Sequence, residues 1–205
     1  MRYVIGVDVG TGSVRAGVYD TQGTQHGYAV KDIAMHVPQP GWAEQSSHDI
    51  WCAVGSCVKA ALKGAGLTGK DIVGIGFDAT CSLVLSDSDG AELPIGDTSD
   101  HDVILWLDHR SQADADAINA TNDPMLRSVG GIMSPEMQLP KLRWLKHNRP
   151  KTWAALGRAF DLTDWLTWKA SGDDRRSLCT TVCKWGFDTE AAGNGPLGRW
   201  PEGFF

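Results

Sequence analysis

The sequence lacks the features of secreted, membrane-spanning and nucleic-acid-binding proteins. It contains no apolar run long enough to cross a bilayer, and its first residues lead straight into an apolar β-type stretch with no cleavage-site pattern. Its 19 lysines and arginines are outnumbered by 25 acidic residues, so the net charge is -6 and no broad positive field can collect phosphates. We therefore expect a soluble, cytoplasmic protein with small-molecule partners, and neither nucleic acid nor membrane among them.

Paired cysteines and internal repeats are also missing. The five cysteines are odd in number and lack the close paired spacing of a zinc site, so we expect reduced structural thiols. No repeat of solenoid period is visible. The histidines form no spacing typical of a metal site or a triad, and no role is assigned to His48, His101, His109 and His147. What is present, 205 residues of which 42% are hydrophobic, is typical of one globular domain.

Extended segments dominate the beginning of the chain. Residues 3–9 are β-branched and apolar, a glycine-rich turn follows, and the extended pattern resumes over residues 14–19 and again from residue 24 to about 35. This order predicts a three-stranded antiparallel meander. Residues 36–46 contain two prolines and are expected to form a loop.

Strands and helices then alternate. Ser46 or Ser47 is predicted to cap a helix over residues 49–63 that ends near Gly64. Strands are expected at residues 72–77 and 82–85, an apolar run at 103–107, and helices from about 111 to 119 and over residues 139–147, 150–156 and 162–169. The pattern predicts an α/β domain with a mixed sheet.

The sequence DVGTGSVR at residues 8–15 lies between the first two predicted strands. This context excludes a P-loop, and the glycine spacing excludes a dinucleotide fingerprint. Its glycines still allow backbone N–H groups to approach phosphate oxygens, its hydroxyls can donate to them, and its aspartate can hold Mg²⁺. A plain glycine hairpin with the aspartate as a turn cap is equally open. The candidate nucleotide contacts are Asp8, Gly10, Thr11, Gly12, Ser13 and Arg15, with Asp8 also the metal ligand.

Several segments together resemble known families. Residues 8–13 resemble the phosphate hairpin of the actin, hexokinase and Hsp70 ATPase superfamily. PGWAEQ at residues 40–45, followed by DIW at 49–51, closely resembles the P-G-W-x-E-Q…W segment of the FGGY family of carbohydrate kinases. GIGFDATCSL at 74–83 and WLDHR at 106–110 look like that family's substrate-loop and W-x-D-x-R segments. The resemblance covers residues 3–189 and implies a ribonuclease H-like domain with a mixed five-stranded sheet and flanking helices.

Within that family, FDATCS at residues 77–82 and TVCKW at 181–185 look most like the D-ribulokinase branch. The resemblance implies ATP and Mg²⁺ as cofactors and a ketopentose or pentitol that is phosphorylated at a terminal hydroxyl. It places Ala79 against the ketose and Lys184 on sugar hydroxyls, and gives Asp108 and Arg110 either direct contacts or an ion pair supporting the pocket wall. The substrate residues it implies are Asp78, Ala79, Thr80, Asp108, Arg110 and Lys184.

The residues themselves leave other interpretations open. Lys184 could extend along an apolar surface to reach water, Asp108 and Arg110 could form a surface pair of little energetic value, and Asp78 could cap a turn. For the whole chain, the alternatives are a non-enzymatic sugar- or nucleotide-binding module and a xylulose- or glycerol-kinase-type member of the family. A chaperone-type nucleotide switch is disfavoured by the PGWAEQ segment and by Lys184.

The resemblance also implies a division into domains. Residues 1–190 correspond to the family's N-terminal domain, and residues 191–205 are expected to be an irregular, truncated tail. In the family the catalytic aspartate and most of the adenosine pocket belong to a C-terminal domain, so no catalytic residue is assigned and the chain alone is expected to be inactive or nearly so. An uncovered cleft face would favour self-association, including a homodimer.

Overall fold

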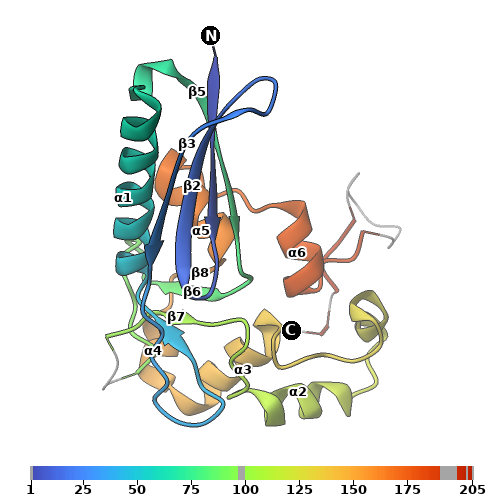
Figure 1. Cartoon of the computed structure of the whole chain (residues 1–205). Helices are drawn as coiled ribbons and strands as arrows, with labels where there is room; N and C mark the ends of the chain where they lie inside the picture. Colours follow the sequence, from blue (N-terminus) through green and yellow to red (C-terminus); the bar gives the residue numbers. More distant parts are fainter. Residues whose placement is uncertain (1, 97–99, 190–197, 202, 205) are drawn as a thin grey trace.

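Two four-stranded sheets organise the computed structural model, which describes residues 2–96, 100–189, 198–201 and 203–204 (Figure 1). The first sheet has the order β3-β2-β1-β5 and the second the order β4-β7-β6-β8. The strands of the first sheet are β1 (Tyr3–Val9), β2 (Ser13–Asp20), β3 (Gln25–Asp32) and β5 (Ile72–Ala79). Those of the second are β4 (Glu44–Gln45), β6 (Leu83–Ser86), β7 (Val103–Ile104) and β8 (Arg158–Asp161).

The first sheet is mixed, as the sequence predicts. Strands β1, β2 and β3 form the expected antiparallel meander, and β5 pairs parallel to β1. The expectation of five strands in this sheet is wrong for the described residues, because four pair in it. The predicted strand at residues 82–85 forms as β6 but joins the second sheet, where all four of its residues are buried between β7 and β8.

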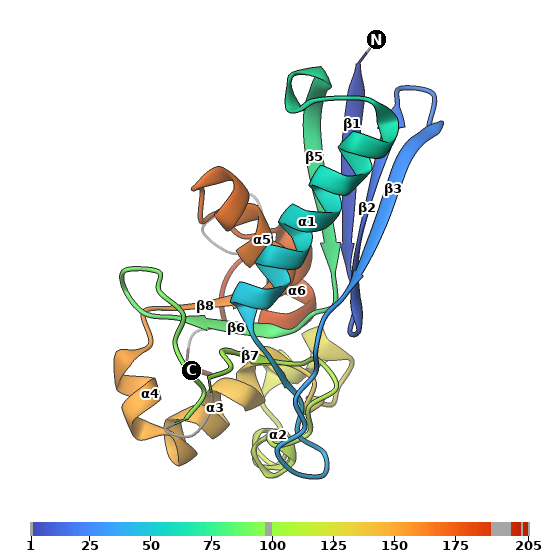
Figure 2. The ribbon, with the colours of Figure 1, turned by 60° about the vertical axis from the view of Figure 1, so that its left-hand side comes forward.

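Helix α1 (Ser47–Ala65) covers the inner face of the first sheet (Figure 2). The predicted cap is confirmed at Ser46, whose side chain accepts a hydrogen bond from the Asp49 N–H at 3.2 Å. The helix ends at Gly66, in the left-handed conformation with φ of 68°, rather than near Gly64. The main core lies between this helix and the sheet, and α5 packs beside it on β5.

The remaining helices gather around the second sheet. The predicted ones are confirmed to within a few residues as α2 (Gln112–Asn119), α3 (Gln138–Asn148), α4 (Pro150–Ala155) and α5 (Leu162–Ser171). Strand β4 lies in the segment expected to be a loop, and α6 (Leu178–Trp185) and β8 have no counterpart in the prediction. Short 3₁₀ turns occupy Gly69–Asp71 and Pro124–Val129.

The structure also bears on the expectations about membrane-spanning helices, cysteines and the C-terminal tail. Within the described ranges, none of the helices combines enough length and apolar character to cross a membrane. All five cysteines are free thiols. Of the tail expected to be irregular, residues 191–197, 202 and 205 lie outside the described residues, and Arg199 forms an isolated β-bridge with Asp188.

Candidate functional site

The glycine turn between β1 and β2 is closed by an ion pair and a backbone hydrogen bond. Asp8 and Arg15 lie opposite each other, with 2.8 Å between Arg15 Nη1 and Asp8 Oδ2, and both side chains are about half exposed. The Gly10 N–H donates to the Ser13 carbonyl at 3.0 Å, and a Cβ at Gly10 would come within 3.3 Å of Arg15 Nη1. A Cβ at Gly12 would meet nothing within 4 Å, so a ligand can approach the backbone there.

Thr11 ties this turn to two distant segments. Its hydroxyl accepts a hydrogen bond from the Trp106 indole N–H at 3.1 Å, and its carbonyl accepts one from the Gln45 amide at 2.8 Å. Trp106 also donates its backbone N–H to the Ser82 hydroxyl at 3.3 Å, and that hydroxyl lies 3.2 Å from Thr80 Oγ1. The expected phosphate turn and the expected substrate loop are therefore joined through Trp106, to which the sequence analysis gave no role.

The carboxyl ends of β1 and β5 bring two expected site carboxylates to neighbouring positions. The strands are parallel and Asp8 is in register with Asp78. Asp78 is exposed, and its Oδ1 accepts the Ala79 N–H at 3.0 Å, as a turn cap would. Together with Arg15, the two aspartates line a surface cavity of about 480 Å³ on the face of the first sheet opposite α1. Ala79, the last residue of β5, is half-buried and packs against the main core rather than lining this cavity.

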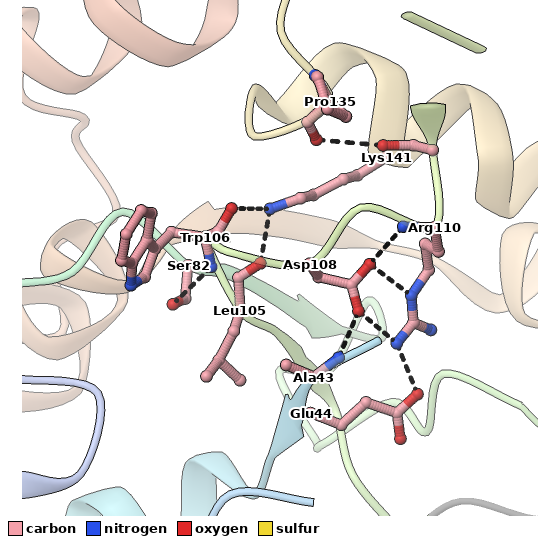
Figure 3. Close-up of polar contacts among 10 residues, drawn as sticks. Ala43, Glu44, Ser82, Leu105, Trp106, Asp108, Arg110, Pro135 and Lys141 are labelled. Carbon is pink, nitrogen blue, oxygen red and sulfur yellow. Dashed lines mark hydrogen bonds and ion pairs between the residues drawn. The ribbon is translucent and has the colours of Figure 1, made fainter. Parts of the chain in front are cut away.

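Asp108 and Arg110 form a buried network (Figure 3). The Asp108 carboxylate accepts hydrogen bonds from Arg110 Nε at 2.9 Å, from Arg110 Nη2 at 2.8 Å and from the Ala43 N–H at 2.6 Å. Arg110 also donates to Glu44 at 2.8 Å and stacks on the Trp42 ring, 4.1 Å from its centroid. Both side chains are 0% exposed, so the alternative of a surface pair is wrong.

This network joins two segments that are far apart in the sequence. Residues 42–44 belong to the PGWAEQ segment, and residues 108–110 to the WLDHR segment. Removing one partner of a buried ion pair leaves an uncompensated charge and costs about 3–5 kcal/mol. Of the two roles considered for Asp108 and Arg110, the geometry fits the supporting ion pair.

Lys141 is a buried residue of this region that the sequence analysis missed. It lies in α3, fully buried, and its Nζ donates to the carbonyl of Leu105 at 2.7 Å and to that of Trp106 at 3.4 Å (Figure 3). Burial lowers its pKa to about 7, against the opposing effect of Asp108. In the sequence, Lys141 could have been singled out as a lysine between apolar positions of a predicted helix. Its two hydrogen bonds to carbonyls fix the backbone that carries the Trp106 indole.

Lys184 lies half-buried on α6, a helix that packs against α3. Burial raises the pKa values of Cys81 and Asp161 and lowers that of Lys141, and the positive charge of Lys184 acts to lower all three. Asp161 is fully buried, and burial raises the pKa of its carboxyl to about 6 although Gln138 donates to it at 3.0 Å. Gln138 also donates to the Cys81 carbonyl at 3.2 Å. Gln138 of α3 therefore joins β8 to the loop that follows β5.

The arrangement combines two kinds of surface. The turn at residues 8–15 offers open backbone, hydroxyls and a carboxylate, which suit phosphate and a divalent cation. The loop at residues 79–82 and Lys184 offer small and hydrogen-bonding groups, which suit a polyhydroxylated molecule. Trp106 lies between them and contacts both.

Comparison with known protein families gives a match over most of the chain. Residues 3–185 match the N-terminal domain of the FGGY family of carbohydrate kinases. The chain is 48% identical to the human FGGY carbohydrate kinase domain-containing protein over 192 residues, which are 92% of this chain and 34% of that protein. It is 43% identical over 190 residues to a D-ribulokinase of Saccharomyces cerevisiae, covering 91% of this chain and 27% of that protein.

The fold has the same relatives. The whole chain superimposes on 39% of a ligand-bound xylulose kinase from Lactobacillus acidophilus with a TM-score of 0.84 and 20% sequence identity. This likeness confirms the expected α/β architecture of sugar kinases. The chain spans 34% and 27% of the lengths of the two curated relatives named above.

Proposed function

The chain belongs to the FGGY family of carbohydrate kinases, and on that premise we propose that residues 1–190 form the sugar-binding, N-terminal domain of an ATP-dependent kinase. The substrate is a ketopentose or pentitol resembling D-ribulose, phosphorylated at a terminal hydroxyl. The identity to a D-ribulokinase supports this substrate class. The carrying observation is the Trp106 bridge, which joins the phosphate turn to the substrate loop within one network.

The phosphate end of the site is assigned to the turn between β1 and β2. Backbone N–H groups around Gly12 and the hydroxyl of Ser13 contact phosphate oxygens, while Asp8 binds Mg²⁺. The Gly10 N–H instead closes the turn on the Ser13 carbonyl. The half-exposed Asp8 carboxylate and the open space at Gly12 fit these groups. Mg²⁺ neutralises charge on the transferred phosphoryl group. Arg15, now paired with Asp8, can turn to a phosphate oxygen when the metal takes its place.

The sugar end is assigned to the loop after β5 and to α6. Ala79 and Thr80 lie against the sugar, Lys184 donates to its hydroxyls, and Asp78 borders the pocket. Asp108 and Arg110 act as the support of the wall, consistent with their burial.

The general base is assigned to an aspartate of a second domain outside these 205 residues. In phosphoryl transfer, a carboxylate orients the nucleophilic hydroxyl and accepts its proton. We therefore expect the chain to bind ligands without turnover.

Isothermal titration calorimetry with D-ribulose and with Mg-ATP, run beside a coupled ADP-release assay, tests this function. We expect D-ribulose binding with no ADP release. Lys184→Met should weaken D-ribulose binding by about tenfold or more, because a charge-assisted hydrogen bond is worth about 1.5–3 kcal/mol. Lys169→Met, an exposed lysine of α5, should leave binding unchanged.

The other outcomes discriminate among the alternatives. D-Xylulose or glycerol binding in preference to D-ribulose would assign the chain to another substrate class of the family. Turnover would contradict the assignment of the base to a second domain. If D-ribulose, D-xylulose, glycerol and Mg-ATP all failed to bind, the proposed site would be overturned.

A further inference from the structure

Two histidines and a glutamate converge beside the PGWAEQ segment. One nitrogen each of His36 and His101 and one carboxylate oxygen of Glu44 all lie within 4.8 Å of one another. Among the described residues, no other set of three histidine, cysteine or acidic side chains is gathered in this way. Sequence spacing gave no hint of this cluster, because its members are spread over residues 36–101.

Backbone pairing fixes the positions of His36 and Glu44. The His36 N–H donates to the Glu44 carbonyl at 2.9 Å, and the Glu44 N–H donates to the His36 carbonyl at 2.8 Å. Residues that exchange two such bonds stand directly opposite each other, with both side chains on one face of the pair. The backbone pairing therefore holds the His36 and Glu44 side chains next to each other.

His101 is fixed by its own backbone and by the residue that follows it. Its carbonyl accepts the Ile95 N–H at 2.9 Å. The next residue, Asp102, is buried and accepts hydrogen bonds from the backbone N–H and the hydroxyl of Ser47 at 2.8 and 2.5 Å. The segment carrying His101 is thereby anchored to the start of α1.

The two imidazoles lie close together, but they are stacked. Their ring centroids are 4.9 Å apart and their planes differ by 2°, so the His36 ring must rotate before one nitrogen of each ring can face the same ion. With metal–nitrogen distances of about 2.1 Å, two imidazoles on one tetrahedral ion have centroids roughly 5 Å apart. The ligating atoms must still close to about 3.4 Å from one another. His36 is exposed, so its side chain is free to make this adjustment.

The third ligand is already oriented by an outer partner. Glu44 is 3% exposed, and one of its oxygens accepts from Arg110 Nη2 at 2.8 Å. Hydrogen bonds from outside the ligand set typically hold metal ligands in place. Arg110 is itself bound by Asp108, so this group of three charged side chains carries a net charge of one negative unit.

There is also room for further ligands. His36 and Glu44 line a surface cavity of about 300 Å³ together with Trp42, Gly96 and Arg149. Two imidazoles and a carboxylate leave open coordination positions, and a cavity of this kind admits water to fill them. Imidazole and carboxylate ligands together suit Zn²⁺ and similar divalent transition metals rather than Mg²⁺.

We propose that His36, Glu44 and His101 form a binding site for a divalent transition-metal ion of the Zn²⁺ class, distinct from the Mg²⁺ position at Asp8. The ion links the segment before β4 to the segment before β7. The first of these segments contacts Asp108 and Arg110 through Ala43 and Glu44, so the ion stabilises the fold beside this pair.

Titration of the untagged, metal-free chain with ZnCl₂, followed by calorimetry and thermal unfolding, tests this site. We expect one equivalent to bind and to raise the Tm. His36→Ala and His101→Ala should each weaken binding by about tenfold or more, because each removes a ligand. His147→Ala, an exposed histidine paired with Asp114, is the matched control and should bind as the unchanged chain does.

A Co²⁺ spectrum gives an independent readout. Co²⁺ bound by two imidazoles and a carboxylate in a low-coordinate site gives visible absorption bands that are lost in His36→Ala. Because His36 is exposed, the His36→Ala variant should keep the far-UV circular dichroism of the unchanged chain. It therefore tests the metal site even if His101→Ala fails to fold. Zn²⁺ affinity unaltered by His36→Ala, or reduced equally by His147→Ala, would show that the ion binds elsewhere and would overturn the proposal.

Discussion

Among the described residues, Lys141 is the lysine whose pKa departs most from its ordinary value, and its burial explains why. Its ammonium is buried against two backbone carbonyls, and desolvation lowers its pKa from 10.5 to about 7. In the unfolded chain the same lysine keeps its proton up to about pH 10.5. Between pH 7 and 10.5 the unfolded state therefore binds more protons than the folded state, and this residue's contribution to stability rises with pH.

Lys141→Met tests this titration. The free energy of unfolding should fall relative to the unchanged chain, because two carbonyls lose their donor, at a cost of about 1–3 kcal/mol. The gap should widen from pH 7 to pH 9 by up to about 1.4 kcal/mol per pH unit. Urea unfolding at several pH values measures it, with exposed Lys146→Met as the control, whose gap should stay constant. A gap for Lys141→Met that does not change with pH would mean that the residue remains charged when folded.

The sequence indicated which residues matter in some cases, but it did not indicate how deeply they are buried or which groups they contact. The WLDHR segment drew attention to Asp108 and Arg110, yet their burial depends on Ala43 and Glu44, more than sixty residues away in the sequence. Lys141 was missed because lysines in helices usually extend to water. Only the tertiary fold shows that carbonyls of the Trp106 segment face its ammonium.

Helix α1 has two glycines near its end, and they differ in conformation. Gly64 lies inside the helix, exposed, and a Cβ there would meet nothing within 4 Å. Gly66 is the left-handed cap, with φ of 68° and hydrogen bonds to the carbonyls of Leu62 and Lys63. The sequence pattern predicts the helix end at the first glycine, and the structure places it at the second.

Alanine at the two positions should have opposite effects. Gly64→Ala should stabilise the protein by about 0.5–1 kcal/mol, because alanine loses less backbone freedom in a helix. Gly66→Ala should destabilise it by about 1 kcal/mol, because a Cβ disfavours the left-handed conformation. Denaturant midpoints measure both changes. Equal destabilisation by the two substitutions would place the end of the helix at Gly64 after all.

Long elements were predicted well and short ones poorly. The meander and α1 repeat their apolar pattern often enough to reveal a period, whereas β4 and β8 have two and four residues. Strand β8 depends on pairing with the buried strand β6, with Phe160 opposite Val84. Helix α6 was not predicted, although Ser177 caps it by accepting a hydrogen bond from the Cys179 N–H.

At the scale of the whole molecule, the first sheet has an uneven cover. Its inner face is packed under α1, but its outer face leaves Val4, Tyr28 and Val30 between 39% and 51% exposed. Gly6 and Gly17 lie in register on this face, and the Tyr19 ring lies over Gly17, 2.6 Å from where a Cβ would stand. Exposed apolar side chains therefore lie on this face beside the charged residues Asp8, Arg15 and Asp78, and such side chains favour contact with another protein surface.

We expect the isolated chain to self-associate through this face. Sedimentation velocity should detect association that increases with protein concentration, and Val30→Glu should weaken it by placing a charge on the face. Val37→Glu, at a valine of similar exposure on the loop before β4, is the control and should change little. Association that Val37→Glu abolishes and Val30→Glu leaves intact would assign the contact to another surface.

The sheet topology also has a consequence for how the chain reaches its native state during synthesis. The β1–β2–β3 meander needs only neighbouring segments and can assemble early, but β1 acquires its partner β5 only after α1 has been made. Likewise Leu83 of β6 waits for Asp161 of β8. Until then, two strand edges are unpaired, and such pairings across long stretches of chain form slowly. The nascent polypeptide is therefore most prone to misassembly between completion of the meander and emergence of β8.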